Sequence, residues 1–469
     1  MDEIKLSDDV IKQIKDFKYR DLTKEQESLI DKLITDKELK ECYKKYDLCG
    51  NCKRPRRNYY FCNCLFQQNF KNYTSGNHDV DEFIQKAQLK ANNVNKIIEW
   101  IEYDKFEDVE YLAKGGFGTT FKAVWKDGSW KLNNNDQFER NGETKVALKC
   151  LHNSQDITTD FLKEVESNIL AYDSGGTVRC FGITKDPKTN NFMMVMDLKK
   201  GGLRQYLNDN FISLNWEQKV ENLCDITFGL SDIHKKGLIH HDFHCGNILS
   251  DINNGSFVTD LGLCQPANIK SSQISNKKIY GVLPYVAPEV LRGEGYTQKS
   301  DIYGFGIIAY EICTGFPPYY DIAHGDFLAM KICKGLRPKS NYKIPQLIVN
   351  IINQCWDANP LKRPNADELH ESIWNLYHDI HSNKVDSIIY GEAKEADEIN
   401  KKSFFPVQLP LSSTSTLSYM THPQAVYTSR LLDFKNLPEP KNADKNDDLE
   451  YSDSLKMDFT KLDIKDESS

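Results

Sequence analysis

The feature that most constrains the fold is a change of hydrophobic pattern along the chain. From about residue 106 the apolar residues come in short runs that are typical of strands. After about residue 200 they come at the wider spacing of helices, as far as about residue 380. Beyond that point, stretches such as PLSSTSTLSYMTHPQ cannot bury enough apolar surface to order themselves. We therefore predict a folded region over residues 106–380 and a mostly disordered tail over residues 381–469.

Three segments precede the folded region. Residues 1–47 are charged, and their apolar residues have a helix-like spacing, which predicts a helical N-terminal segment. Residues 48–66 hold a cluster of cysteines. In residues 67–105 the stretch VDEFIQKAQLKANNVNKIIEWIEY repeats apolar positions at intervals of three and four, which predicts a helical linker.

The composition favours a cytoplasmic protein. The net charge of −8 argues against general attraction to nucleic acid or to membranes. The first residues, MDEIKLSDDV, contain no apolar signal core, and no run approaches the ~18 apolar residues of a membrane helix. Five of the 13 cysteines lie between residues 42 and 64, and the others are scattered, often in apolar runs. This distribution predicts reduced thiols and not a disulfide framework.

A glycine-rich turn and a lysine inside a strand are the first candidates for a binding site. The stretch EYLAKGGFGTTFKAVW reads as strand, turn and strand. Its glycines at 115, 116 and 118 would let the backbone N–H groups approach a polyphosphate, although a plain glycine hairpin explains the pattern equally well. The apolar strand KVALKC contains Lys149, which must find a negative partner if it is buried. The candidate partner is Glu164, in the amphipathic stretch DFLKEVESNIL.

The stretch LIHHDFHCGN concentrates chemically reactive side chains. His240 and His244 are four apart, as in zinc enzymes, but the His-Glu-x-x-His pattern needs glutamate where this sequence has a second histidine. Asp242 and Asn247 are five apart, and Asp260 follows a short strand further on. Two carboxylates and an amide are the oxygen ligands and the base that magnesium-nucleotide chemistry needs.

The order of these motifs resembles the signature set of protein kinases, over roughly residues 106–378. The glycine loop, strand lysine, helix glutamate, H-x-D-x-x-x-x-N, D-x-G and the A-P-E of YVAPEV follow one another at spacings typical of that family. The resemblance implies an α+β, bilobal fold with a small β-rich N-lobe and a larger helical C-lobe over residues 106–380. The ending WDANPLKRP is similar to the tyrosine-kinase-like group, and the whole chain resembles a set of such kinases that is expanded in some symbiotic fungi.

The resemblance also implies roles for single residues. Asp242 would be the base that accepts the substrate hydroxyl proton, and Asn247 and Asp260 would bind Mg²⁺. Lys149 would hold the α- and β-phosphates of ATP and would be steadied by Glu164. Contacts with the nucleotide would come from Ala113, Gly115, Gly116, Gly118, Thr120, Ala147, Lys149, Met196, Asp197 and Leu198.

The match departs from the family at two histidines. His241 replaces the arginine that reads an activation-loop phosphate, and His244 replaces the lysine that serine/threonine kinases place near the transferred phosphate. The second change, together with Val282 in place of the family threonine that contacts that lysine, removes a sequence cue for serine/threonine against tyrosine specificity. Glu289 and Arg363 remain, and by resemblance they form a buried ion pair, while Asp301 braces the catalytic loop.

Two functions fit this sequence. The first is an ATP-dependent protein kinase of intracellular signalling, which transfers the γ-phosphate to serine, threonine or tyrosine hydroxyls of a protein substrate. The second is a pseudokinase, which keeps the fold and the ATP site and acts as a signalling scaffold. The sequence favours the enzyme, because all four groups that would hold the nucleotide and metal or accept the proton are present.

The stretch CGNCKRPRRNYYFCNC is a separate candidate site for a metal. Cys49, Cys52, Cys62 and Cys64 could bind one zinc ion in a tetrahedron, and the metal would then supply folding energy to a segment with little apolar mass. Unliganded, reduced cysteines are the alternative, because the second pair is spaced more tightly than usual. The basic run KRPRR between the pairs is a solvated loop or, alternatively, a nuclear address.

Overall fold

The chain divides into two compact units in the computed structural model. The strand-rich unit comprises Met1–Gly202, Phe228–Leu238 and Ile248–Cys264, and the helical unit comprises Leu203–Thr227, Ile239–Asn247 and Gln265–Ser469. The structure describes residues 6–17, 21–46, 74–115, 118–133, 138–151, 154–155, 157–173, 175–251, 255–267, 279–404 and 420–442.

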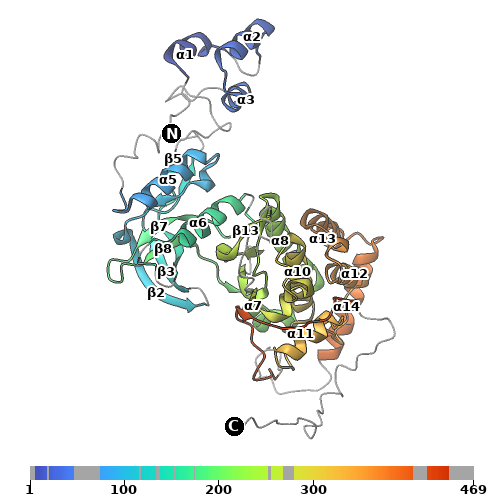
Figure 1. Ribbon diagram of the computed structural model, residues 1–469. Coiled ribbons are helices and arrows are strands. Elements are labelled where there is room, and N and C mark those ends of the chain that lie inside the picture. The colour runs from blue at the N-terminus through green and yellow to red at the C-terminus, as the bar shows by residue number, and fades with distance from the viewer. Residues whose placement is uncertain are drawn as a thin grey trace. The chain divides into compact units, whose positions relative to one another are not determined.

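A six-stranded sheet forms the centre of the strand-rich unit (Figure 1). Its strands, in spatial order, are β1 (Glu99–Trp100), β7 (Cys180–Lys185), β8 (Phe192–Asp197), β6 (Thr144–Leu151), β3 (Gly118–Trp125) and β2 (Phe106–Lys114). All neighbours are antiparallel except β1 and β7. In β6, Val146 and Leu148 are buried in one core cluster, so that Lys149 points to the other face of the sheet.

The predicted linker over residues 67–105 is an integral part of this unit, and the prediction needs correction there. Helix α5 (His78–Lys90) is followed by β1, which joins the sheet edge beside β7. Val80 of α5 and Ile98 pack in one cluster with Phe161 and Val165 of α6 (Thr159–Ala171). The apolar periodicity indicated the helix correctly, but it gave no sign of a two-residue strand that follows it.

The N-terminal helices form a small cluster of their own. Helices α1 (Asp8–Ile14), α2 (Lys24–Leu33) and α3 (Lys37–Tyr46) bring together the buried side chains Ile14, Ile30, Ile34 and Tyr43. The Tyr43 hydroxyl donates a hydrogen bond to the Ile14 carbonyl at 2.9 Å. The helical prediction for residues 1–47 is therefore confirmed wherever this segment is described.

The helical unit is built around one buried helix. Helix α10 (Gln298–Thr314) begins with a capping box at Thr297, is buried along nearly its whole length, and ends at Gly315 with φ of 74°. The other helices in the C-terminal part of the chain are α7 (Leu203–Asn210), α8 (Trp216–Lys235), α9 (Pro288–Leu291), α11 (Asp326–Cys333), α12 (Gln346–Cys355), α13 (Ala366–His381) and α14 (Ile388–Phe404). A helix with apolar residues on all sides is typical of the centre of a core.

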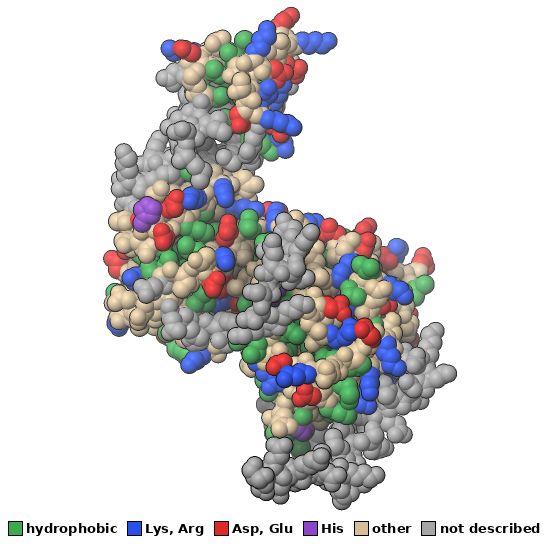
Figure 2. Space-filling model, in the orientation of Figure 1, with side chains coloured by type: hydrophobic (Ala, Val, Ile, Leu, Met, Phe, Trp, Pro, Cys, Tyr) green, Lys and Arg blue, Asp and Glu red, His purple; other side chains and the backbone are tan. Residues whose placement is uncertain are grey.

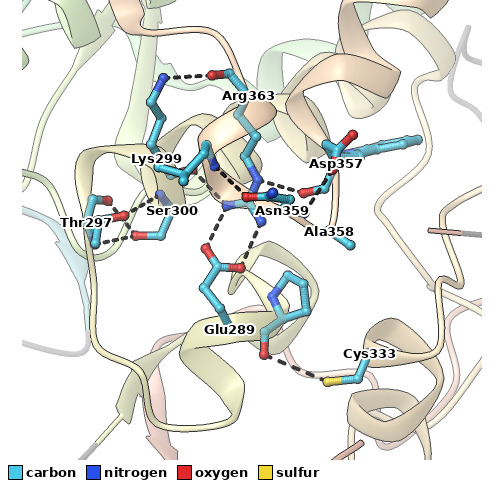
Figure 3. Close-up of polar contacts among 12 residues, drawn as sticks. Glu289, Thr297, Lys299, Ser300, Cys333, Asp357, Ala358, Asn359 and Arg363 are labelled. Carbon is cyan, nitrogen blue, oxygen red and sulfur yellow. Dashed lines mark hydrogen bonds and ion pairs between the residues drawn. The ribbon is translucent and has the colours of Figure 1, made fainter. Parts of the chain in front are cut away.

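The expected buried ion pair is present in this unit. Arg363 donates from Nη1 and Nη2 to the two carboxylate oxygens of Glu289 at 2.6 and 2.8 Å (Figure 3). Nε and Nη1 also donate to the carbonyls of Asp357 at 2.8 Å and Lys299 at 2.9 Å. Each nitrogen of the guanidinium therefore makes at least one hydrogen bond, as a buried charge requires.

The structure differs from the predicted disordered tail over residues 381–469 in two stretches. Helix α14 is fixed by polar contacts with the rest of the unit: Asp397 accepts from the Trp216 N–H at 3.2 Å, and Asn400 bonds both the N–H and the carbonyl of Lys343. Residues 420–442 include strand β15 (Arg430–Leu432), which pairs with β14 (Ile279–Gly281). Backbone pairing with β14 and the burial of Leu432 hold this second stretch in place. The rest of the tail lies outside the described residues.

Charges of both signs share the described surface, and most of the described thiols are buried. Lys and Arg side chains are interspersed with Asp and Glu on the face shown in Figure 2. Of the nine cysteines that are described, six are buried and none forms a disulfide. Within the described part of the chain, no helix is both long enough and apolar enough to cross a membrane.

Candidate active site

Three charged side chains meet in the strand-rich unit. The Lys149 ammonium on β6 lies 2.7 Å from Glu164 Oε1 on α6 and 2.9 Å from Asp260 Oδ1. Burial alone lowers the pKa of Lys149, but the charges of Asp260 and Glu164 outweigh burial and raise the pKa above its ordinary value. The lysine is therefore a permanent cation, and its expected pairing with Glu164 is present.

The segment that carries Asp260 is shaped for close approach to this cluster. Asp260 follows strand β12 (Gly255–Val258) and has a left-handed backbone, with φ of 61°. Two residues later, a Cβ at Gly262 would lie 2.5 Å from Glu164 Oε2. Only glycine fits there without a shift, which gives a physical reason for the glycine of the D-x-G motif.

The predicted nucleotide contacts lie on neighbouring strands. Thr120 is the Cα partner of Ala113 on β2 and of Lys149 on β6. Ala147 is the partner of Met196 on β8. The remaining predicted contacts on this side, Asp197 and Leu198, follow Met196 directly in the chain. The register thus brings residues from four strands to adjacent positions of one sheet.

The glycine loop is partly described. The Gly115 N–H donates to the Gly118 carbonyl at 2.8 Å. A Cβ at Gly118 would lie 2.2 Å from the Cys150 carbonyl oxygen of β6, so close strand packing excludes any side chain at this position. Sequence reasoning assigned this glycine to phosphate approach, and the structure adds a packing reason. Gly116 lies outside the described residues.

The catalytic-loop candidate in the helical unit is held by Asp301. Its carboxylate accepts hydrogen bonds from the N–H groups of His240 at 2.8 Å and His241 at 3.2 Å. These bonds hold His241 in a left-handed conformation with φ of 70°. The His241 ring stacks on the Tyr296 ring, with 4.6 Å between the ring centroids. Burial lowers the pKa of His241 to about 4, so its ring is neutral near pH 7. A neutral ring at this position cannot pair with a phosphate as an arginine would.

Asp242 and Asn247 lie together at the other end of this loop. The Asn247 side-chain N–H₂ donates to the Asp242 carbonyl at 2.9 Å, which leaves the amide oxygen of Asn247 as a potential metal ligand. The ring of His244 also reaches this carboxylate, with its Nε2 3.4 Å from Asp242 Oδ2. Zinc binding by the histidines of this loop is not supported, because no group of three or more His, Cys, Asp or Glu side chains in the described residues could hold a metal ion.

A residue that the sequence analysis did not select completes this cluster. The Ser429 hydroxyl donates a hydrogen bond to Asp242 Oδ2 and lies 3.2 Å from His244 Nε2. Burial raises the pKa of Asp242, but the electrostatic effect of His244 and the hydrogen bonds from His244 and Ser429 outweigh burial and lower the pKa below its ordinary value. Asp242 is therefore an ionised hydrogen-bond acceptor that already contacts a serine hydroxyl.

The predicted zinc ligands cannot be placed. Cys49, Cys52, Cys62 and Cys64 lie outside the described residues. The zinc interpretation of this cluster therefore stays a prediction from the sequence.

Comparisons with known proteins agree with the motif order. The family model described as "Protein tyrosine and serine/threonine kinase" matches residues 106–373. A probable serine/threonine-protein kinase of Dictyostelium discoideum is 28% identical over 59% of this chain, and the probable serine/threonine-protein kinase roco5 of the same organism is 29% identical over 58%. The dual specificity protein kinase pyk3, also from Dictyostelium, is 27% identical over 62% of the chain.

These relatives are much longer proteins. The match covers 16% of the first, 10% of roco5 and 20% of pyk3. The family model ends before α14 and before residues 420–442, so neither stretch belongs to the shared domain. The shared part holds Lys149, Glu164, Asp242, Asn247 and Asp260. The model spans more than half of the sequence, and the chain therefore belongs to the family of protein tyrosine and serine/threonine kinases.

Proposed function

We propose that this chain is an ATP-dependent protein kinase that transfers the γ-phosphoryl group of ATP to hydroxyl groups of protein substrates. The observation that carries the proposal is the contact of an ionised Asp242 with the Ser429 hydroxyl. A pseudokinase scaffold needs no such carboxylate. The complete set of Lys149, Asp242, Asn247 and Asp260 supports the enzyme over the scaffold.

The proposed roles in nucleotide binding follow from charge and donor type. Lys149 is a permanent cation and would bind the α- and β-phosphates, with Glu164 fixing its position. Asp260, whose side chain is one-quarter exposed, and the amide oxygen of Asn247 fit Mg²⁺, because hard cations prefer oxygen ligands. Bound Mg²⁺ would neutralise phosphate charge.

Asp242 would act as the base. Its carboxylate orients the acceptor hydroxyl and takes up the proton as the oxygen–phosphorus bond forms. Transfer through a positioned carboxylate requires an ionised form at working pH, and the lowered pKa of Asp242 supplies it. His241 cannot pair with an activation-loop phosphate as an arginine would, because the ring is neutral and lacks the planar fork.

Serine or threonine is the acceptor that we favour. The relatives named above are described as serine/threonine kinases or, for pyk3, as a dual specificity kinase. Within the family, we place the chain in the tyrosine-kinase-like group from its WDANPLKRP motif. We also propose a cytoplasmic location, with the basic run KRPRR as the basis of a nuclear alternative.

Replacing Lys149 by methionine tests the proposed activity. Removal of the phosphate-binding cation should lower kcat/KM for ATP at least a hundredfold, equivalent to about 2.7 kcal/mol of transition-state stabilisation. The measurement is transfer of labelled phosphate from Mg-ATP to a generic protein substrate. Lys145→Met is the matched control, because Lys145 is an exposed residue of the same strand, and this variant should keep its activity. A wild-type protein that binds ATP but transfers no more label than Lys149→Met would establish the scaffold function.

The zinc prediction for the cysteine cluster has a separate test. Protein purified under reducing, chelator-free conditions should contain about one zinc ion per chain, because four thiolates form a tetrahedral site. Elemental analysis measures the metal. Double replacement of Cys49 and Cys52 by serine should remove it, whereas Cys42→Ser, which lies outside the cluster, should not. Metal-free wild-type protein would contradict the zinc prediction.

A further inference from the structure

Residues 420–442 form a docked segment on the helical unit. The segment is the red trace beside α7 and α11 in Figure 1. Near its start, the His422 N–H donates to the Tyr320 carbonyl at 2.8 Å, and near its end the Lys441 N–H donates to the Cys333 carbonyl at 3.0 Å. Backbone bonds at both ends show that the segment follows a defined path.

The centre of the docked segment is strand β15, which pairs with β14, the strand that comes just before the A-P-E motif in the sequence. β15 pairs antiparallel with β14, with Gly281 opposite Arg430 and Ile279 opposite Leu432. Leu432 is buried. Strand addition of this kind is a common mode of peptide recognition, in which main-chain bonds give affinity and side-chain pockets give specificity. The docked segment therefore binds as a peptide ligand would.

An aromatic anchor precedes the strand. The central carbon of the Arg204 guanidinium lies 4.3 Å from the centroid of the Tyr427 ring. The His324 ring contacts the Tyr427 ring edge-on, with 4.9 Å between the two ring centroids. The Tyr427 hydroxyl donates to the Pro318 carbonyl at 2.9 Å. Arg204 is itself paired with Glu311 at 2.8 Å, which fixes its guanidinium over the ring. Tyr427 is thus the side chain on which docking should depend most.

Ser429 lies between Tyr427 and strand β15, in the position of a hydroxyl that would accept the phosphoryl group. Its hydroxyl donates to Asp242, and His244 lies 3.2 Å from the same oxygen. The neighbouring Thr428 also carries a hydroxyl, but its side chain is exposed. Docking therefore selects one of two adjacent hydroxyls and hydrogen-bonds it to the carboxylate that would take its proton.

We propose that the docked segment is an intramolecular substrate and that Ser429 is an autophosphorylation site of this chain. The inference rests on the proposed kinase function. In the reaction, Ser429 Oγ forms a bond to the γ-phosphorus of ATP, the bond from that phosphorus to the β–γ bridging oxygen breaks, ADP leaves, and the hydroxyl proton passes to Asp242. Until then, the segment occupies β14 and excludes other peptides from that edge.

The product should leave the site more easily than the substrate. Phosphorylation adds a charge of about −1.5 to −2 next to the Asp242 carboxylate, and like charges in a buried setting repel each other. Release of the segment would open β14 to other substrates. Phosphorylation of Ser429 would thereby raise activity towards exogenous peptides.

The experiment follows phosphate on Ser429 in the full chain. Phosphatase-treated protein is incubated with Mg-ATP at two protein concentrations roughly tenfold apart, and phosphopeptides are quantified by mass spectrometry. A tethered acceptor has an effective concentration that does not depend on dilution, so the fraction phosphorylated per unit time should be equal in both samples. Ser429→Ala should remove this phosphopeptide, and the matched Thr428→Ala should keep it.

Tyr427→Ala tests the docking without touching the acceptor. Loss of the anchor should slow Ser429 phosphorylation tenfold or more and lower KM for an exogenous peptide about tenfold, because the tethered competitor is weakened. Two results would overturn this inference alone, provided that the exogenous peptide is phosphorylated. In the first, Ser429 stays unmodified. In the second, Ser429 reacts faster at the higher protein concentration. Failure to phosphorylate either acceptor would overturn the proposed function and the inference with it.

Discussion

Asp242→Asn should lower kcat for phosphotransfer by ~10³-fold, the middle of the range that a positioned general base contributes. Asparagine keeps the size and the planar shape of the side chain, but it cannot accept the proton of the acceptor hydroxyl. The shorter bond from Asn247 goes to the main-chain carbonyl at 2.9 Å, and an asparagine oxygen can also accept the longer one, now to Oδ2 at 3.4 Å, so the loop should keep its shape. ATP affinity should change little, since Lys149 and Asp260 are untouched. Turnover and nucleotide titration, measured side by side, separate the two effects.

The control for this variant is Asp209→Asn. Asp209 is exposed on α7 and bonds only Gln205 among the described side chains, so the same chemical change should leave kcat within about twofold of wild type. Turnover of Asp242→Asn within tenfold of wild type would contradict the assignment of the base. The role would then pass to His244, whose Nε2 lies 3.2 Å from the Ser429 hydroxyl.

Arg363→Met should cost about 3–5 kcal/mol of folding free energy, because it leaves the buried Glu289 carboxylate without its partner. Both side chains are almost completely buried, and solvent cannot replace the two lost hydrogen bonds. The carbonyls of Asp357 and Lys299 also lose their donor. Urea unfolding, followed by tryptophan fluorescence, measures the change.

A surface ion pair provides the comparison. Arg292 pairs with Glu294 and Glu439, and the Glu439 side chain is 82% exposed. Arg292→Met should therefore cost less than about 1 kcal/mol. The double variant Arg363→Met with Glu289→Leu should be more stable than Arg363→Met, since no charge is left buried. Equal stabilities of Arg363→Met and Arg292→Met would contradict the burial argument.

The sequence predicted the pairing of Lys149 with Glu164 for a local reason. A lysine in an apolar strand needs a carboxylate, and the next amphipathic helix offered Glu164, which lies 2.7 Å away. The same logic of burial and spacing located the helices of residues 1–47 and the sheet strands after residue 106. Local patterns could not reveal β1, because two residues carry no periodicity and their pairing with β7 depends on residues about 80 positions further along the chain.

The sequence by itself determined the kinase motifs, their order and the residues proposed to bind phosphate, to bind metal and to accept a proton, since each role needs a particular side-chain type at a particular spacing. Only the tertiary structure decided that the Ser429 hydroxyl forms a hydrogen bond with Asp242, which is 187 positions away in the sequence. The tail reads as polar and unstructured because its order comes from backbone pairing of β15 with β14 and from the Tyr427 anchor. Main-chain hydrogen bonds are available to almost every residue, and so they leave no signature in the amino-acid sequence.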